Sequence, residues 1–223
     1  MRLLLVGCEY AGTTTLAHAI DDWMFEKMGA RYSLIHEHWQ IPHTSGHPDD
    51  TTPEEREWLL QATPKFMEMH QRHSLYYHVQ AGTFKNPDGM VVGGHIEDAV
   101  YGPLYYDYGH DGSRSSIARG IENRIMEIAR DTVLVLVKAS PEAIANRLRE
   151  SPHRHGVLRE QDIEHVLARF DEEFGASTIR YRLTYDTTDK TPEETLAQFA
   201  KDIGPHLSEK DRSRLLAHRA LGG

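Results

Sequence analysis

An apolar segment that leads into a glycine-framed loop and then into a helix constrains the fold of this chain more than any other feature. The apolar run ends at Gly7, a second glycine follows at Gly12, and a helical pattern runs from Thr13 to Met28. The continuous apolar character of residues 2–7 predicts a strand that is buried on both faces. The order of strand, loop and helix therefore predicts a first structural unit of the α/β type.

The loop has the spacing of the phosphate-binding pattern G-x-x-x-x-G-K-[ST], except that Thr13 stands where the lysine belongs. Gly7 and Gly12 permit backbone angles that a side chain would forbid, and amides at a helix N-terminus can surround an anion. Thr14 takes the place of the hydroxyl that binds Mg²⁺. We predict that Gly7, Gly12, Thr13, Thr14 and Thr15 hold a phosphate-bearing ligand. An ordinary turn between a strand and a helix is the alternative.

The rest of the chain alternates apolar runs with helical patterns, which predicts a parallel sheet with helices on both faces. Further strands are expected at residues 32–35, at 90–92 running on to 96, at 132–137 and at 182–185. Helix starts are marked by Thr52-Pro53, Ser140-Pro141 and Thr191-Pro192, and a terminal helix is expected from Ser208. Glycine and polar residues predict long loops at 38–52 and 102–116.

Length and charge restrict the classes of protein that remain. At 223 residues, the chain is expected to form one domain over residues 1–223. The net charge of −9 disfavours a nucleic-acid partner, and no apolar stretch approaches the length of a membrane span. Cys8 is the single cysteine, so no intrachain disulfide can form. We expect a cytoplasmic protein with a small-molecule partner, and leave a homodimer open.

Four segments, spread over most of the chain, resemble the P-loop kinases of the nucleoside and nucleoside-monophosphate kinase group. His36-Glu37-His38-Trp39 resembles the E-x-W signature that ends the second strand. Residues 94–101 resemble the acidic-Arg-Ser segment, with Asp98 where an arginine is usual. Residues 135–149 resemble the fourth strand with its following helix, and residues 185–188 resemble the loop on the base side.

This resemblance implies a three-layer α/β/α P-loop fold, with a mainly parallel five-stranded sheet in the order 2-3-1-4-5. It implies ATP and Mg²⁺ as cofactors, an acceptor-side insertion at about 38–85 and a lid-like segment at about 150–160. The implied catalytic residues are Glu37, as the base near the acceptor hydroxyl, and Arg147, Arg154 and Arg159, as cations. The implied contacts are Trp39, His38, Glu97, Asp98 and Tyr101 with the substrate, Asp186 with the nucleotide, and Thr14 and Glu97 with Mg²⁺.

The missing lysine leaves three functions open. The first is a kinase that transfers a phosphoryl group from ATP–Mg²⁺ to a nucleoside-like hydroxyl acceptor with a displaced cation. The second is a nucleotide-binding pseudo-kinase. The third is a sulfotransferase, because Gly12-Thr13-Thr14 also resembles the S-G-T-T loop of that family; however, Lys138 and Asn146 do not match its second donor motif. We expect Lys138 to be a surface residue at a strand end.

Two other groups of side chains are conspicuous. The histidines at positions 36, 38, 43, 47, 70, 73 and 78 contain no metal-binding framework, so we expect them to be solvated or hydrogen-bonded. Tyr101, Tyr105, Tyr106 and Tyr108 can stack on a ligand ring or pack in the core, and the sequence does not choose between the two. For the arginines predicted as cations, a solvated helix face with salt bridges is an equal alternative. For Glu37, the alternative is a carboxylate at a strand end that caps a loop.

Overall fold

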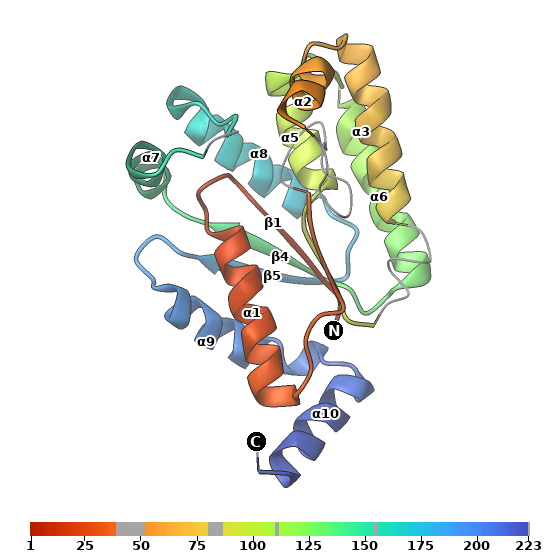
Figure 1. The fold of residues 1–223 in the computed structure, drawn as a ribbon, viewed down its shortest axis with the longest axis vertical. Helices are drawn as coiled ribbons and strands as arrows, with labels where there is room; N and C mark the ends of the chain where they lie inside the picture. Colours follow the sequence, from red (N-terminus) through yellow and green to blue (C-terminus); the bar gives the residue numbers. More distant parts are fainter. Residues whose placement is uncertain (39–51, 80–86, 110–111, 154–155, 223) are drawn as a thin grey trace.

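Five parallel strands form a single central sheet in the order β2-β3-β1-β4-β5 (Figure 1). The computed structural model describes residues 1–38, 52–79, 87–109, 112–153 and 156–222. The strands are β1 (Leu3–Gly7), β2 (Leu34–His38), β3 (Gly89–Gly93), β4 (Val133–Lys138) and β5 (Tyr181–Asp186). The predicted fold class and strand order are therefore confirmed.

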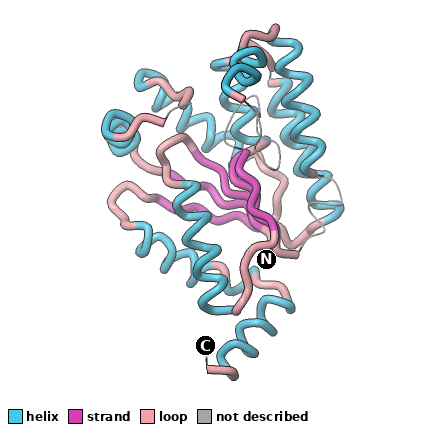
Figure 2. Tube along the Cα trace, in the orientation of Figure 1, coloured by secondary structure: helices cyan, strands magenta, loops and turns pink. Residues whose placement is uncertain are grey.

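Helices cover both faces of this sheet (Figure 2). The helices are α1 (Thr13–Met28), α2 (Pro53–Leu60), α3 (Pro64–His78), α5 (His95–Tyr105), α6 (Ser113–Ile128), α7 (Pro141–Glu150), α8 (Ile163–Gly175), α9 (Pro192–Asp202) and α10 (Glu209–Ala220). Helix α1 packs against α9 and α10, whereas α5 packs against α6 and α8. Among the described residues, no helix has the length and the apolar character to cross a membrane.

Local sequence signals start most of these helices. Thr52, Thr191 and Ser208 each form a capping box with the acidic residue three positions later, and Ser140 caps α7 through Ala143 N. Helix α1 begins and ends at the predicted residues, and its end is closed by Gly29 in the left-handed region. The predicted helix starts are thus confirmed.

The turn after β3 differs from the prediction. The strand was expected to run on to Ile96, but β3 ends at Gly93 and α5 begins at His95. Gly93 and Gly94 have φ angles of 81° and 125°, a conformation that residues with a side chain rarely adopt, and this turn stops the strand. The prediction overlooked this pair of glycines because apolar residues flank it.

Two other predicted boundaries were also inaccurate. The predicted loop at 102–116 is shorter, because α5 extends to Tyr105 and α6 begins at Ser113. Strand β2 starts at Leu34, two residues later than expected. Most of the predicted loop at 38–52 lies outside the described residues.

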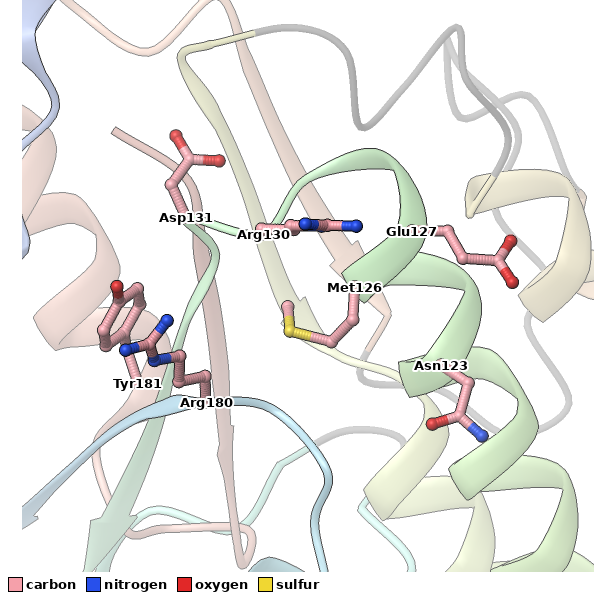
Figure 3. Close-up of a pocket in the computed structure, with 7 residues that line it drawn as sticks. All are labelled: Asn123, Met126, Glu127, Arg130, Asp131, Arg180 and Tyr181. Atoms are coloured by element: carbon pink, nitrogen blue, oxygen red, sulfur yellow. The ribbon is translucent and has the colours of Figure 1, made fainter.

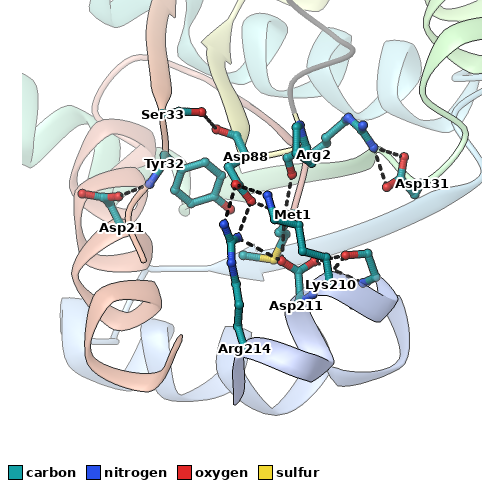
Figure 4. Close-up of polar contacts among 12 residues, drawn as sticks. Met1, Arg2, Asp21, Tyr32, Ser33, Asp88, Asp131, Lys210, Asp211 and Arg214 are labelled. Atoms are coloured by element: carbon teal, nitrogen blue, oxygen red, sulfur yellow. Dashed lines mark hydrogen bonds and ion pairs between the residues drawn. The ribbon is translucent and has the colours of Figure 1, made fainter. Parts of the chain in front are cut away.

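A buried ionic cluster fastens the C-terminal helix to the sheet (Figure 4). Asp88, just before β3, accepts hydrogen bonds from Arg214 at 2.7 Å and from Lys210 at 2.9 Å, both on α10. The α-amino group of Met1 lies 3.0 Å from Asp211 and 3.2 Å from Asp88. The cluster therefore joins three segments that are distant in the sequence.

We expect Asp88→Asn to lower the free energy of unfolding by about 3 kcal/mol, because it removes the charge that pairs with the partly buried Arg214 and, together with Asp211, with the buried Met1 amine. Burial alone would raise the pKa of Asp88, but the hydrogen bonds from Arg214 and Lys210 and the Met1 amine lower it well below its ordinary value. This stabilisation is present above pH ~4 and is lost as the pH falls further. Denaturant unfolding between pH 2 and 7 measures both effects.

The exposed Glu26→Gln on α1 is the control and should leave the unfolding curve unchanged. If Asp88→Asn retained the full acid dependence of the wild type, the cluster would not be its source.

Candidate functional site

The loop between β1 and α1, residues 7–12, is the one predicted to bind phosphate, and we call it the phosphate loop. It lines a cavity of about 840 Å³ at the carboxyl ends of β1 and β3. Its walls come from residues 7–10 and 12–16 of the loop and α1, from Val92 and Gly93 at the end of β3, and from α5. Parallel α/β sheets bind their ligands at this edge. Residues predicted to bind phosphate therefore lie together in a hollow of the size of a small-molecule site.

The loop has a backbone shaped by its glycines. A side chain at Gly7 would place Cβ 2.5 Å from the carbonyl oxygen of Val137, so only glycine fits beside β4. Gly12 has a φ of 95° and lets the chain turn directly into α1. No described side chain caps the first turn of α1, and this turn contains no acidic residue. Its N–H groups thus remain available to an anion.

Glu97 is the most unusual side chain of the cavity. It is 5% exposed, and its Oε1 accepts a hydrogen bond from Gly7 N at 3.1 Å. Its Oε2 is buried without a hydrogen-bond partner among the described residues. Burial raises the pKa of Glu97 to about 8, and the hydrogen bonds from backbone N–H groups offset this only in part. The second oxygen is therefore available to a cation at the base of the loop.

Tyr101, one turn further along α5, also contacts the loop. Its hydroxyl accepts a hydrogen bond from Glu9 N at 3.0 Å. The adjacent Cys8 is buried, and burial raises the pKa of its thiol to about 12, so the thiol stays protonated at neutral pH. Tyr101 lines the cavity as expected, but its hydroxyl is engaged by the protein itself.

Asp98, expected to contact the substrate, points away from the cavity and is 1% exposed. Its Oδ2 accepts a hydrogen bond from Arg114 Nε at 2.7 Å, and its Oδ1 accepts one from Tyr108 OH at 3.0 Å. Arg114 also donates to Glu68 on α3 at 2.8 Å. Asp98 thus joins α5 to α6 and α3. No sequence pattern predicted this contact, because Arg114 belongs to the next helix along the chain.

The basic residues considered in the sequence analysis lie in different places. Arg147 lines the cavity and donates to the carbonyl oxygens of Tyr10 at 2.9 Å and Thr187 at 2.7 Å. Arg159 lies over the ring of Tyr105, and Arg154 lies outside the described residues. Lys138 pairs with Asp171 at 2.6 Å, as a residue at a strand end on the surface.

Two further cavity residues carry basic side chains: Lys190, which was not identified from the sequence, and His153, which belongs to the predicted lid-like segment at about 150–160. Lys190 lies on the β5 side, and its Nζ donates to Gln198 at 2.6 Å. His153 lies above the loop, where it stacks on Tyr10. Asp186, expected to contact the nucleotide, instead accepts a hydrogen bond from Thr188 N at 2.8 Å, whereas its neighbour Thr187 lines the cavity.

Strand β2 brings the predicted base to the same edge of the sheet. Glu37 pairs in register with Val92 and His38 with Gly93, and both of these partners line the cavity. Trp39 and the side chains of Glu37 and His38 lie outside the described part of the structure. Within the described residues, no group of three or more His, Cys, Asp or Glu side chains could hold a metal ion.

A second hollow of about 490 Å³ lies at the opposite edge of the sheet, near the starts of β4 and β5 (Figure 3). Arg180 lies over the ring of Tyr181 there, 5.3 Å from its centroid. The carboxylates of Asp131 and Glu127 pair with Arg2 and Arg124. None of the predicted site residues lies in this hollow.

Comparisons with known proteins agree with this architecture. No family model matches the chain, and no curated protein matches its sequence. A deoxyadenosine kinase from M. mycoides matches with a TM-score of 0.60 at 14% identity, covering 92% of this chain and 100% of the other. The YorR protein from Bacillus subtilis, solved with phosphorylated GDP, matches with a TM-score of 0.56 at 15% identity, covering 93% and 99%.

An unliganded sugar kinase from Janibacter sp. has a TM-score of 0.51 at 12% identity, covering 92% of this chain and 95% of the other. At these identities the likeness concerns the fold. The chain has the fold of the P-loop kinases.

Glu97 gives a prediction for the pH dependence of stability. Its folded pKa of about 8 lies above the unfolded value, so the folded protein binds an extra proton between about pH 4.5 and 8. Stability should therefore fall as the pH rises through this window. We expect Glu97→Gln to remove this loss, which is on the order of 3 kcal/mol by pH 8.

Denaturant unfolding of both proteins at pH 5 and pH 8 measures this difference. Parallel pH dependences in the wild type and the variant would contradict it.

Proposed function

We propose that this chain binds a nucleoside triphosphate together with Mg²⁺ and transfers the terminal phosphoryl group to a hydroxyl of a small, nucleoside-like acceptor. The observation that carries the proposal is the Oε2 of Glu97, which is buried beside the phosphate loop and has no hydrogen-bond partner among the residues that the structure describes. A buried, unpartnered carboxylate oxygen next to uncapped helix N–H groups offers adjacent places for a cation and for phosphates.

Each described part of the site has a role in this proposal. The N–H groups of Gly12, Thr13 and Thr14 would bind phosphate oxygens. Thr14 and Glu97 would hold Mg²⁺, which supplies neutralisation of the charge on the phosphates when bound. Glu37, from the end of β2, would accept the proton of the attacking hydroxyl. Solved proteins of this fold are recorded with bound dCTP and with phosphorylated GDP, in line with a nucleotide ligand.

The lost lysine has candidate replacements in the cavity. Arg147 adds positive charge beside the loop, although its hydrogen bonds go to backbone carbonyls. Lys190 and His153 line the same cavity. Phosphoryl transfer depends on positive charge around the moving group more than on the identity of the residue that supplies it.

A second candidate is a protein that binds the nucleotide without transferring its phosphoryl group, and Thr13 at the lysine position favours it. Titration calorimetry with ATP–Mg²⁺ and with a phosphoadenosyl donor, followed by transfer assays with labelled ATP and a panel of nucleosides, separates the candidates. Transfer to a nucleoside would support the kinase, binding without transfer would support the second candidate, and preference for the phosphoadenosyl donor would indicate a sulfotransferase.

For a kinase, we expect Glu37→Gln to lower kcat by about 10²-fold or more, because it removes the proton acceptor. Initial rates of phosphate transfer at saturating nucleotide give this value. Glu26→Gln, an exposed carboxylate on α1, should retain the wild-type rate. An unchanged kcat in Glu37→Gln would remove Glu37 from the mechanism.

Thr13→Lys tests whether the site lacks a cation. If the existing basic residues suffice, we expect less than about a tenfold change in the transfer rate. A rise of about 10³-fold or more, the usual contribution of such a cation, would show that the natural chain is catalytically deficient and would favour the second candidate.

A further inference from the structure

Glu9, in the middle of the phosphate loop, directs its side chain toward a segment almost 150 residues later in the sequence. Its Oε1 accepts a hydrogen bond from Val157 N at 3.1 Å, and its Oε2 accepts one from Leu158 N at 3.4 Å. Two successive backbone N–H groups form a site that suits an anion. In this chain a carboxylate of the loop itself takes that site.

Tyr10, the next residue of the loop, holds the same segment. Its hydroxyl accepts a hydrogen bond from His153 N at 2.9 Å, and the two rings stack with centroids 4.1 Å apart. Tyr10 has a φ of 67°, which is unfavourable for a bulky residue. Arg147 donates to the carbonyl oxygen of Tyr10 and thereby supports this conformation.

The two segments are also closely packed. A Cβ added at Gly156 would lie 2.9 Å from Glu9 Oε2 and 3.1 Å from Tyr10 OH. Contacts under 3.0 Å require one of the atoms to move. Glycine at position 156 therefore permits this approach. We use the name lid segment for residues 153 and 156–158, which are the described residues of this segment that contact the loop.

The charge of Glu9 explains why the contact matters. A carboxylate in a phosphate loop repels phosphate unless N–H groups or cations compensate its negative charge. Burial raises the pKa of Glu9 above its ordinary value, and the N–H groups of Val157 and Leu158 and the nearby His153 offset this only in part. The lid segment thus stabilises the charged form and draws the carboxylate toward itself.

We propose that Glu9 is a positioning residue that holds the lid segment against the phosphate loop before any ligand binds. The contact places His153 in the cavity above the loop. The hydrogen bonds to Glu9 and Tyr10 then set the position of this segment.

Amide hydrogen exchange of the ligand-free protein tests this proposal. In Glu9→Ala, the amides of Val157 and Leu158 should exchange at least about tenfold faster, because hydrogen bonds to a charged acceptor are lost. Glu9→Gln, which keeps one acceptor oxygen, should recover part of the protection. Glu26→Ala is the control and should leave these amides unchanged. Equal protection in Glu9→Ala and the wild type would overturn the proposal.

A substitution on the other side of the contact gives an independent check that leaves Glu9 in place. Gly156→Ala should displace the Glu9 carboxylate and accelerate exchange at the same two amides. Gly204→Ala is the matched control, since an added Cβ there meets no atom within 4 Å. Loss of protection in both glycine variants alike would reflect a general loss of stability and would overturn the proposal.

The consequence for ligand binding rests on the proposed function. With a fluorescent ATP analogue and Mg²⁺, Glu9→Ala should release the nucleotide several-fold faster than the wild type in stopped-flow displacement, because the lid segment is no longer held. Slower release would instead make Glu9 a residue that obstructs the site, and would overturn its positioning role. If the wild type bound no nucleotide, the proposed function would fail, and the exchange measurements would still decide the role of Glu9.

Discussion

The close approach of β1 and β4 at Gly7 is the constraint on which the site depends. The parallel register pairs Gly7 with Val137, and a Cβ at Gly7 would lie 2.5 Å from the Val137 carbonyl oxygen. Only glycine therefore fits where the chain leaves β1, and Gly12, with a φ of 95°, then turns it into α1. Because the loop starts here, Gly7 N faces Glu97 and Glu9 N faces Tyr101. One backbone contact in the sheet thus sets the position of the helix N-terminus and of the carboxyl group beneath it.

The electrostatics of the loop differ from those of a loop with a lysine. Thr13 supplies no charge, and the chain adds two carboxyl groups, Glu9 and Glu97, to the walls of the cavity. They are accommodated in different ways. Burial raises the pKa of Glu97 to about 8, so that its carboxyl group is mostly neutral at pH 7. Glu9 is stabilised by backbone N–H groups of the lid segment. This loop therefore offers an anion less positive charge than a loop that carries a lysine.

The sequence predicted what depends on neighbours along the chain and missed what depends on neighbours in space. The strands, the helix starts at Thr52, Ser140, Thr191 and Ser208, and the glycine-framed turn into α1 are encoded in runs of a few residues, and these were found. The start of α3 at Thr63 carries the same kind of signal and was missed. The end of β3 was misplaced because Gly93 and Gly94 stop the strand within an apolar stretch. Three missed contacts join segments that are separated by a helix or more along the chain. They are the ion pair of Asp98 with Arg114, the hydrogen bond from Val157 N to Glu9, and the position of Lys190 in the cavity wall. Periodicity and spacing carry no information about such contacts.

Helix α5 connects the parts of the site that the sequence keeps apart. Glu97 and Tyr101 face the phosphate loop, whereas Asp98 is bound to α6 through Arg114. At the end of the helix, Tyr105 OH accepts a hydrogen bond from Arg159 N and donates one to Asp162, just beyond the lid segment. A shift of α5 would therefore displace the residues that it contacts directly in the phosphate loop, in α6 and just beyond the lid segment. Since α5 follows directly from the glycine turn after β3, the edge of the sheet that carries Glu37 is joined to the same helix. The loop side and the β2 side of the cavity thus share one helix, and under the proposed function this helix would couple the binding of the nucleotide to that of the acceptor.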